Sequence, residues 1–188
     1  MIATGDEAAS REAWRTIMNP ASGETVTFLE TAEESGGAHV VLQIEIAPGG
    51  GAAPHAHRYE TEAFEVLAGT VDLQVGTQRI ALAVGGTASV SPETLHGFRN
   101  STAVPATLRV IASPPEHLER GLRATYYMLR EGLLPKQPLV AALLLQQGGV
   151  YLPPLPRWCY WPLINALARL GRWTGGEAAL ARYGARPT

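Results

Sequence analysis

Two histidines and a glutamate near residue 60 have the types and spacing of metal ligands. In the stretch GGGAAPHAHRYETEAFEVLAG, His55 and His57 lie one residue apart. Side chains two residues apart in an extended segment point to the same side, so the two imidazoles would lie side by side on one face of the strand. Glu62 follows in a strand-like run, in which it would lie on the same face as Phe64 and Val66. The alternative interpretation is that all three are solvated loop residues.

A third histidine extends this pattern. His96 starts a later strand-like run in which Phe98 and Asn100 are in phase with it. Three neutral imidazoles and one carboxylate suit a divalent transition metal such as Fe, Mn, Ni, Cu or Zn. Glu60 has the parity of Glu62 and remains an alternative carboxylate.

The spacing of the first group resembles the cupin superfamily. Intervals of five, one, four and six residues, as in the first cupin motif, separate Gly49, His55, His57, Glu62 and Gly69.

The segment GGTASVSPETLHGFRN resembles the second cupin motif. His96 and Asn100 keep the spacing of that motif. The departures lie in the turn before His96. Counted from Gly85, Ser91 and Glu93 replace the proline and the glycine of the motif. Counted from Gly86, Pro92 is in place, Thr94 replaces the glycine and His96 comes one residue early.

The resemblance covers residues 24–113 and implies a mainly β fold, a cupin-type jelly-roll barrel with a metal in its mouth. It implies the metal ligands His55, His57, Glu62 and His96. We expect one divalent metal, Fe first, with Mn, Ni, Zn and Cu as alternatives. The catalytic residues stay unknown, and the candidates for lining the pocket are Tyr59, Phe64 and Phe98.

The hydrophobic pattern agrees with such a barrel and adds helices after it. Short strand-like runs with glycine-containing turns recur from residue 23 to 114 without helices between them, which is typical of a sandwich or barrel. Helices are predicted in EHLERGLRATYYMLREG, which Ser113 or the following pair of prolines would open and Gly132 would end, in PLVAALLLQQGG, and in WPLINALARLGRW, where Pro162 would lie near the first turn. We therefore predict an N-terminal arm (1–23), a barrel (24–115) and a helical C-terminal extension (116–188).

Composition limits the classes of protein. The net charge of −2 disfavours a general nucleic-acid binder. The single cysteine, Cys159, excludes an intrachain disulfide and fits a reducing compartment. The N-terminus lacks the apolar run of a signal peptide, and no stretch has 18 consecutive apolar residues. The predicted location is cytoplasmic, without a transmembrane segment.

Charge differs between the two main parts of the chain. Residues 1–115 hold 6 basic and 13 acidic residues, a net −7, whereas residues 116–188 hold 9 and 4, a net +5. The extension is expected to pack against the barrel or a twin subunit, so a homodimer is predicted. Binding of the extension to the surface of an anionic membrane is a further alternative, ranked below both kinds of packing.

The predicted partner is a small molecule. The first expectation is an oxygenase acting on an enolisable or aromatic substrate. A redox-neutral, metal-assisted isomerase or cyclase comes second, and a non-catalytic binding or sensing cupin third. These alternatives stay open because the ligand set fixes a metal centre and not a reaction.

Overall fold

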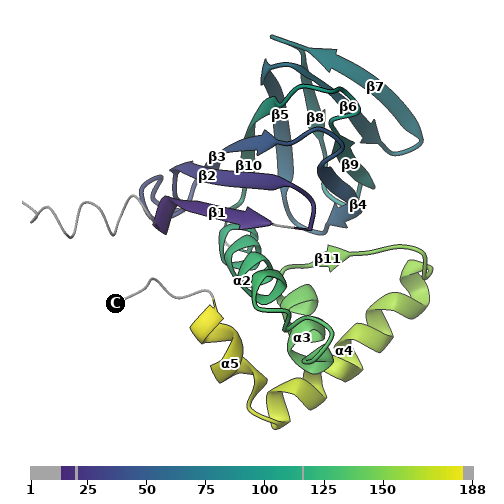
Figure 1. The fold of residues 1–188 in the computed structure, drawn as a ribbon. Helices are drawn as coiled ribbons and strands as arrows, with labels where there is room; N and C mark the ends of the chain where they lie inside the picture. Colours follow the sequence, from purple (N-terminus) through teal and green to yellow (C-terminus); the bar gives the residue numbers. More distant parts are fainter. Residues whose placement is uncertain (1–13, 20, 116, 184–188) are drawn as a thin grey trace, which may run out of the picture.

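Two antiparallel sheets packed face to face form the larger part of the molecule (Figure 1). The computed structural model describes residues 14–19, 21–115 and 117–183, so most of the predicted N-terminal arm lies outside the described residues. In spatial order, the first sheet contains β1 (Thr16–Asn19), β2 (Glu24–Glu30), β3 (Val40–Ile46), β10 (Ala106–Ser113), β5 (Thr61–Ala68) and β8 (Thr87–Val90). The second contains β11 (Val150–Tyr151), β4 (Gly51–His57), β9 (His96–Arg99), β6 (Thr70–Val75) and β7 (Gln78–Ala83). The predicted jelly-roll barrel is confirmed.

Strict alternation builds the barrel core. Every second residue of β3 and β10 is buried, and the buried set is Val40, Leu42, Ile44, Ile46, Ala106, Leu108, Val110 and Ala112. The two strands pair antiparallel, with Leu42 opposite Val110. Because alternate side chains of a strand point to one face, this pattern fills the space between the sheets with apolar groups. Gln43 and Glu45 lie on the other face.

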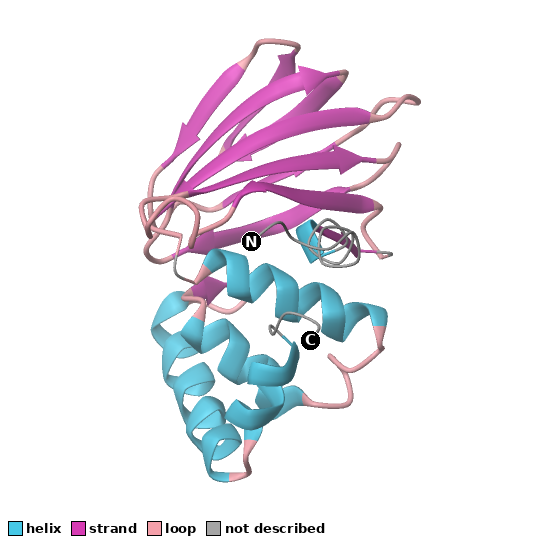
Figure 2. Ribbon diagram, turned by 90° about the vertical axis from the view of Figure 1, so that its left-hand side faces the viewer, coloured by secondary structure: helices cyan, strands magenta, loops and turns pink. Residues whose placement is uncertain are grey.

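Four helices lie together at one end of the barrel (Figures 1 and 2). They are α2 (Leu118–Arg130), α3 (Pro138–Gln147), α4 (Arg157–Trp173) and α5 (Gly176–Tyr183). From α2, Leu118 and Tyr126 are buried in the barrel core, and Leu122 and Leu129 pack against it. The other helices form smaller apolar clusters of their own. The extension is thus attached mainly through α2.

Three elements differ from the sequence prediction. β1 and β11 lie outside the predicted barrel range, yet β1 pairs with β2 and β11 pairs with β4. α4 begins at Arg157 rather than at Trp161, so Pro162 lies inside the helix and not in its first turn. A proline there removes only one helical hydrogen bond, to the carbonyl of Trp158, and its ring is exposed. Among the described helices, none has both the length and the apolar content needed to cross a membrane.

Candidate metal centre

The structure brings the four predicted ligand residues together. His55 and His57 lie on β4, Glu62 on β5 and His96 on β9. One nitrogen or carboxylate oxygen from each residue lies within 4.8 Å of those from the others. His55 pairs directly with His96 across the β4–β9 ladder. Residues 41 positions apart in the sequence are therefore neighbours in one sheet, with Glu62 facing them from the other sheet.

Strand alternation turns these side chains inward. On β5, Glu62, Phe64 and Val66 are buried, whereas Glu65 points outward to Arg109. On β4, the pairing with β9 shifts between Ala52 and His55, so a bulge precedes the histidine pair. Bulges of this kind redirect side chains at the rims of barrels.

The remaining motif residues shape the backbone around the site. Asn100 is fully buried, and its amide donates to the carbonyls of Ile46 (3.1 Å) and Val104 (2.7 Å). Gly69 has a φ of +72°, and a Cβ there would lie 2.9 Å from the carbonyl oxygen of Pro105. Both motif positions thus serve the fold and contribute no ligand atom to the group of four.

Backbone carbonyls fix the tautomers of two histidines. The Nδ1 of His55 lies 2.8 Å from the carbonyl oxygen of Ala53, and the Nδ1 of His96 lies 2.8 Å from that of Thr94. A carbonyl only accepts, so each Nδ1 must carry the proton. This directs the lone pair of each neutral ring to Nε2, the arrangement that metal-binding histidines commonly show.

Several buried polar atoms at the site lack a hydrogen-bond partner. Within the described part of the chain these include the Nδ1 of His57, the Nε2 of His96 and the Oε2 of Glu62. The last two atoms are only 2.6 Å apart, but they are not aligned as donor and acceptor. The Nε2 of His57 lies 3.8 Å from the same oxygen. The unpartnered Nε2 of His96 and Oε2 of Glu62, with the Nε2 of His57 beside them, fit a divalent cation between them.

The pKa values also favour metal binding. Burial, aided by the charges of His57 and His96, lowers the pKa of His55 to about 4, and burial lowers that of His57. Burial alone would raise the pKa of Glu62, but the contact with His96 and the charges of the histidines hold it at about 2. At neutral pH the site therefore offers an ionised carboxylate and two neutral imidazoles.

His96 differs from the other two histidines. Burial by itself would lower its pKa, but the contact with Glu62 outweighs burial and raises it. A proton on His96 therefore occupies the place that a cation would take.

The pocket candidates fall into two groups. Phe64 and Phe98 are buried at 3% and 8% exposure, with ring centroids 6.4 Å apart, and the ring of Phe64 lies 6.1 Å from that of His96. They form an apolar wall behind the histidines. Tyr59 is 44% exposed and lies at the surface, 5.5 Å from the ring of His117.

Glu60 is buried beside the site but outside the group of four. It is 2% exposed, and its Oε1 has no partner among the described residues. Burial raises its pKa, the nearby Glu62 also raises it, and His117 lowers it. Glu60 is expected from the sequence only as an alternative ligand, and no local pattern predicts its proximity to His117, which lies 57 positions along the chain.

A turn and the extension support β4, the strand that carries His55 and His57, from outside. The backbone N–H of Glu93 donates to the carbonyl of His57 (2.7 Å), and Glu93 has a φ of +63°. Arg157 of the extension reaches back to the carboxylate of Glu93 at 2.6 Å. Val150 of β11 pairs with His57. None of these contacts was predicted, because they join residues far apart in the sequence.

A hollow of about 720 Å³ lies along the second sheet. Its lining includes polar residues that point away from the core, among them Asp72, Gln74, Arg79 and Arg99, and it contains none of the four grouped residues. We assign the chemistry to the histidine group and not to this hollow, because only the former gathers metal-binding atoms.

Comparisons with known proteins agree with this geometry. Residues 42–112 match the family model described as "Cupin domain". No curated protein matches the sequence.

Several solved structures resemble the chain, with identities below 25% and TM-scores below 0.5. A sugar phosphate isomerase from a cupin superfamily, from Silicibacter pomeroyi, is 23% identical with a TM-score of 0.43, covering 48% of this chain and 59% of that chain. The chain thus spans less than two thirds of that protein. A predicted oxalate decarboxylase from Thermotoga maritima is 16% identical with a TM-score of 0.45, covering 47% and 78%. A protein from Thermus thermophilus is 24% identical with a TM-score of 0.47, covering 61% and 98%.

The family match spans the strands that carry all four grouped residues. The resemblance read from the histidine and glycine motifs is confirmed, and the chain contains a cupin domain.

Proposed function

We propose that the chain is a metal-dependent oxygenase of small molecules, with an enolisable or aromatic substrate. The ligands of its one divalent metal are His55, His57, Glu62 and His96. The observation that carries the proposal is the convergence of their donor atoms within 4.8 Å, with buried lone pairs that have no other partner.

The ligand set supports Fe(II) as the first choice. Three neutral imidazoles and one carboxylate leave a net charge of +1 on a divalent centre and do not fill an octahedral shell. A metal held there supplies Lewis acidity and, in the case of Fe, redox chemistry with O₂. The surroundings of Glu62 keep its carboxylate ionised. The carbonyls of Ala53 and Thr94 hold a proton on the Nδ1 of His55 and of His96, so the lone pair of each ring is at Nε2.

The surroundings suit an apolar substrate. Phe64 and Phe98 give the interior next to His96 an apolar wall that excludes water. Tyr59 lies at the surface, where it could border the entrance. These positions favour an aromatic or enolisable compound over a strongly charged one.

One observation favours a second function, a metal-assisted isomerase or cyclase. Isomerisation needs a group that carries a proton, and Glu60 is a buried carboxyl beside the site with an unpartnered oxygen. In this function Glu60 would move the proton, and the metal would polarise the substrate without redox change.

Metal exchange separates the two functions. The apo-protein would be reloaded with Fe(II) or Zn(II) and assayed on enolisable and aromatic compounds, with and without O₂. The oxygenase proposal expects turnover with Fe(II) that consumes O₂. Turnover with Zn(II) under nitrogen, abolished in E60Q, would establish the isomerase instead. If one of these compounds binds tightly but is not converted with either metal, with or without O₂, the protein is a binding or sensing module.

A further inference from the structure

The side of α4 that faces solvent is apolar. Trp158 and Trp173 are 80% and 85% exposed, and Leu163 and Leu170 are 47% and 44% exposed. A surface helix normally turns polar residues to water. The opposite side of α4 packs inward through Tyr160, Ile164 and Ala168, so the exposed side is not the packing face.

The exposed residues form one stripe. The two tryptophans are fifteen positions apart in the helix, which places them about 22 Å apart along the axis and only about 60° apart around it. Pro162 and Ala166 are exposed and fall between them. Before the helix, residues 152–156 are all apolar and all exposed. We call residues 152–156 together with the exposed apolar residues of α4 the docking face: Trp158, Pro162, Leu163, Ala166, Leu170 and Trp173.

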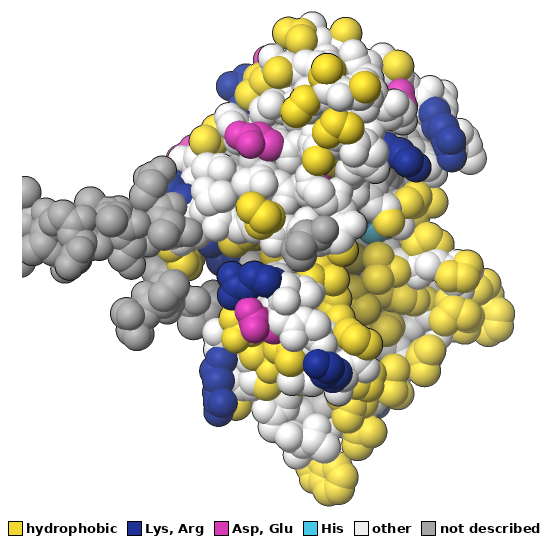
Figure 3. Space-filling view, viewed as in Figure 1, with side chains coloured by type: hydrophobic (Ala, Val, Ile, Leu, Met, Phe, Trp, Pro, Cys, Tyr) yellow, Lys and Arg dark blue, Asp and Glu magenta, His cyan; other side chains and the backbone are white. Residues whose placement is uncertain are grey.

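The docking face is large and continuous. Figure 3 shows apolar side chains that begin just below the barrel and continue along the right-hand, outer side of the helical part. Exposed apolar surfaces of this kind mark sites of contact with a protein or a membrane.

The charged residues of α4 are all basic, and of these Arg157 is paired with Glu93 of the barrel. Between Glu131 and Glu177 the sequence has no acidic residue, but it has Lys136, Arg157, Arg169 and Arg172. By helical geometry Arg169 falls inside the stripe and Arg172 at its border. The partner should therefore be apolar and anionic together.

A second copy of the chain fits this requirement poorly. A two-fold contact through the same face would bury Arg169 of both copies, and α4 has no acidic residue that could pair with either. An anionic lipid surface meets both requirements, because tryptophan rings favour the membrane–water interface and arginine side chains reach lipid phosphates. The apolar stripe of α4 then lies in the plane of the interface, which agrees with a helix that does not cross the membrane.

We propose that the docking face binds the surface of an anionic lipid bilayer. The proposal does not depend on the metal centre, since α4 contributes no residue to that group.

The test uses the full chain and vesicles. Co-sedimentation would be measured with phosphatidylcholine vesicles and with vesicles that also contain phosphatidylglycerol. The variants are W158Q/W173Q for the apolar stripe and R169Q/R172Q for the charge. The matched control is V84Q/V104Q, which removes exposed apolar side chains from the barrel. Circular dichroism and size-exclusion chromatography would check the fold and the oligomeric state.

We expect sedimentation with the anionic vesicles, weaker in both variants and unchanged in the control. W158Q/W173Q should lower the partition coefficient about tenfold or more, because each large apolar side chain taken from water contributes at least this order. Wild-type protein that stays in the supernatant with anionic vesicles overturns the proposal. So does equal binding by folded W158Q/W173Q protein. A dimer that W158Q/W173Q dissociates, without vesicle binding, assigns the face to a second copy.

Discussion

Among single residues, His57 and His96 approach the proposed metal centre from two different strands. His57 lies at the end of β4 and His96 at the start of β9. Removing either imidazole takes away one of four donor atoms, so H57A and H96A should each lower metal occupancy at least about tenfold. Elemental analysis of protein purified without chelator measures this. H39A is the matched control, because His39 pairs with Glu30 away from the group. Unchanged occupancy in both site variants would remove these residues from the ligand set.

The pH dependence of metal binding follows from His96. Its pKa is raised above the ordinary 6.5, whereas that of His55 is about 4 and that of Glu62 about 2. Below the pKa of His96 a proton competes with the metal, and above the ordinary histidine value of 6.5 the other three groups do not, because burial also lowers the pKa of His57. Between these limits the apparent affinity should fall about tenfold per unit as pH falls. Chelator competition at several pH values measures the slope, and a slope near two protons would mean that a second histidine is also protonated.

Glu93 occupies a backbone conformation that glycine prefers. Its φ is +63°, at a position where the cupin motif counted from Gly85 has glycine. Both E93G and E93A lose the side-chain contacts with Arg58 and Arg157. Their difference therefore reports the backbone, and E93G should be the more stable by about 1 kcal/mol. Urea denaturation measures this. At Glu65, in the strand β5, the order should reverse, with E65A more stable than E65G.

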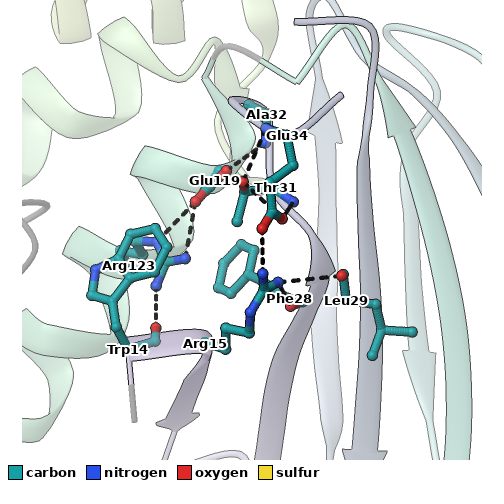
Figure 4. Close-up of polar contacts among 9 residues, drawn as sticks. All are labelled: Trp14, Arg15, Phe28, Leu29, Thr31, Ala32, Glu34, Glu119 and Arg123. Carbon is teal, nitrogen blue, oxygen red and sulfur yellow. Dashed lines mark hydrogen bonds and ion pairs between the residues drawn. The ribbon is translucent and has the colours of Figure 1, made fainter. Parts of the chain in front are cut away.

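At the scale of elements, one arginine joins α2 to the start of the barrel (Figure 4). The guanidinium of Arg123 lies 3.3 Å from the ring centre of Trp14 and 3.8 Å from that of Phe28. It donates to Glu119 on the same helix and to the backbone carbonyl of Trp14. Glu119 in turn accepts from the N–H of Ala32. One buried side chain thus links α2, β2 and the segment before β1.

Loss of this side chain should be costly. R123A leaves the carboxylate of Glu119 without its cation in a largely buried place, so the free energy of unfolding should fall by about 3 kcal/mol. R120A is the control, because Arg120 is exposed on the same helix and should change stability little. Chemical denaturation of both variants checks the prediction, which fails if the two lose equal stability.

The sequence predicts elements well where one local pattern decides them. The alternation in β5 shows that Glu62 and Phe64 share a face, and the motif spacing places His96 near them. β11 is only two residues long, and its pairing with β4 depends on the path of the whole extension. The contact of Glu93 with Arg157 spans 64 residues, so no local pattern contains it. Proline is common in the first turn of a helix, so Pro162 led to a predicted start at Trp161, whereas α4 begins at Arg157.

In the whole molecule, the helical extension completes the barrel in two places. Leu118 and Tyr126 of α2 are buried in the core of the barrel. The hydroxyl of Tyr126 also donates to the carboxylate of Glu24 at 3.3 Å, and burial raises the pKa of that carboxyl. Far along the chain, β11 covers the edge of β4 beside His57. The predicted boundary at residue 115 is therefore crossed by apolar, polar and backbone contacts.

Truncation tests this dependence. A chain that ends at Pro114 loses the apolar residues of α2, each worth about 1.5–3 kcal/mol when fully buried, and exposes the edge of β4. It should unfold at a lower temperature and aggregate, as measured by differential scanning fluorimetry and light scattering. A chain that ends at Tyr183 keeps every described helix and serves as the control. If the shorter chain stays monodisperse and equally stable, the barrel folds independently and the extension is a separate module.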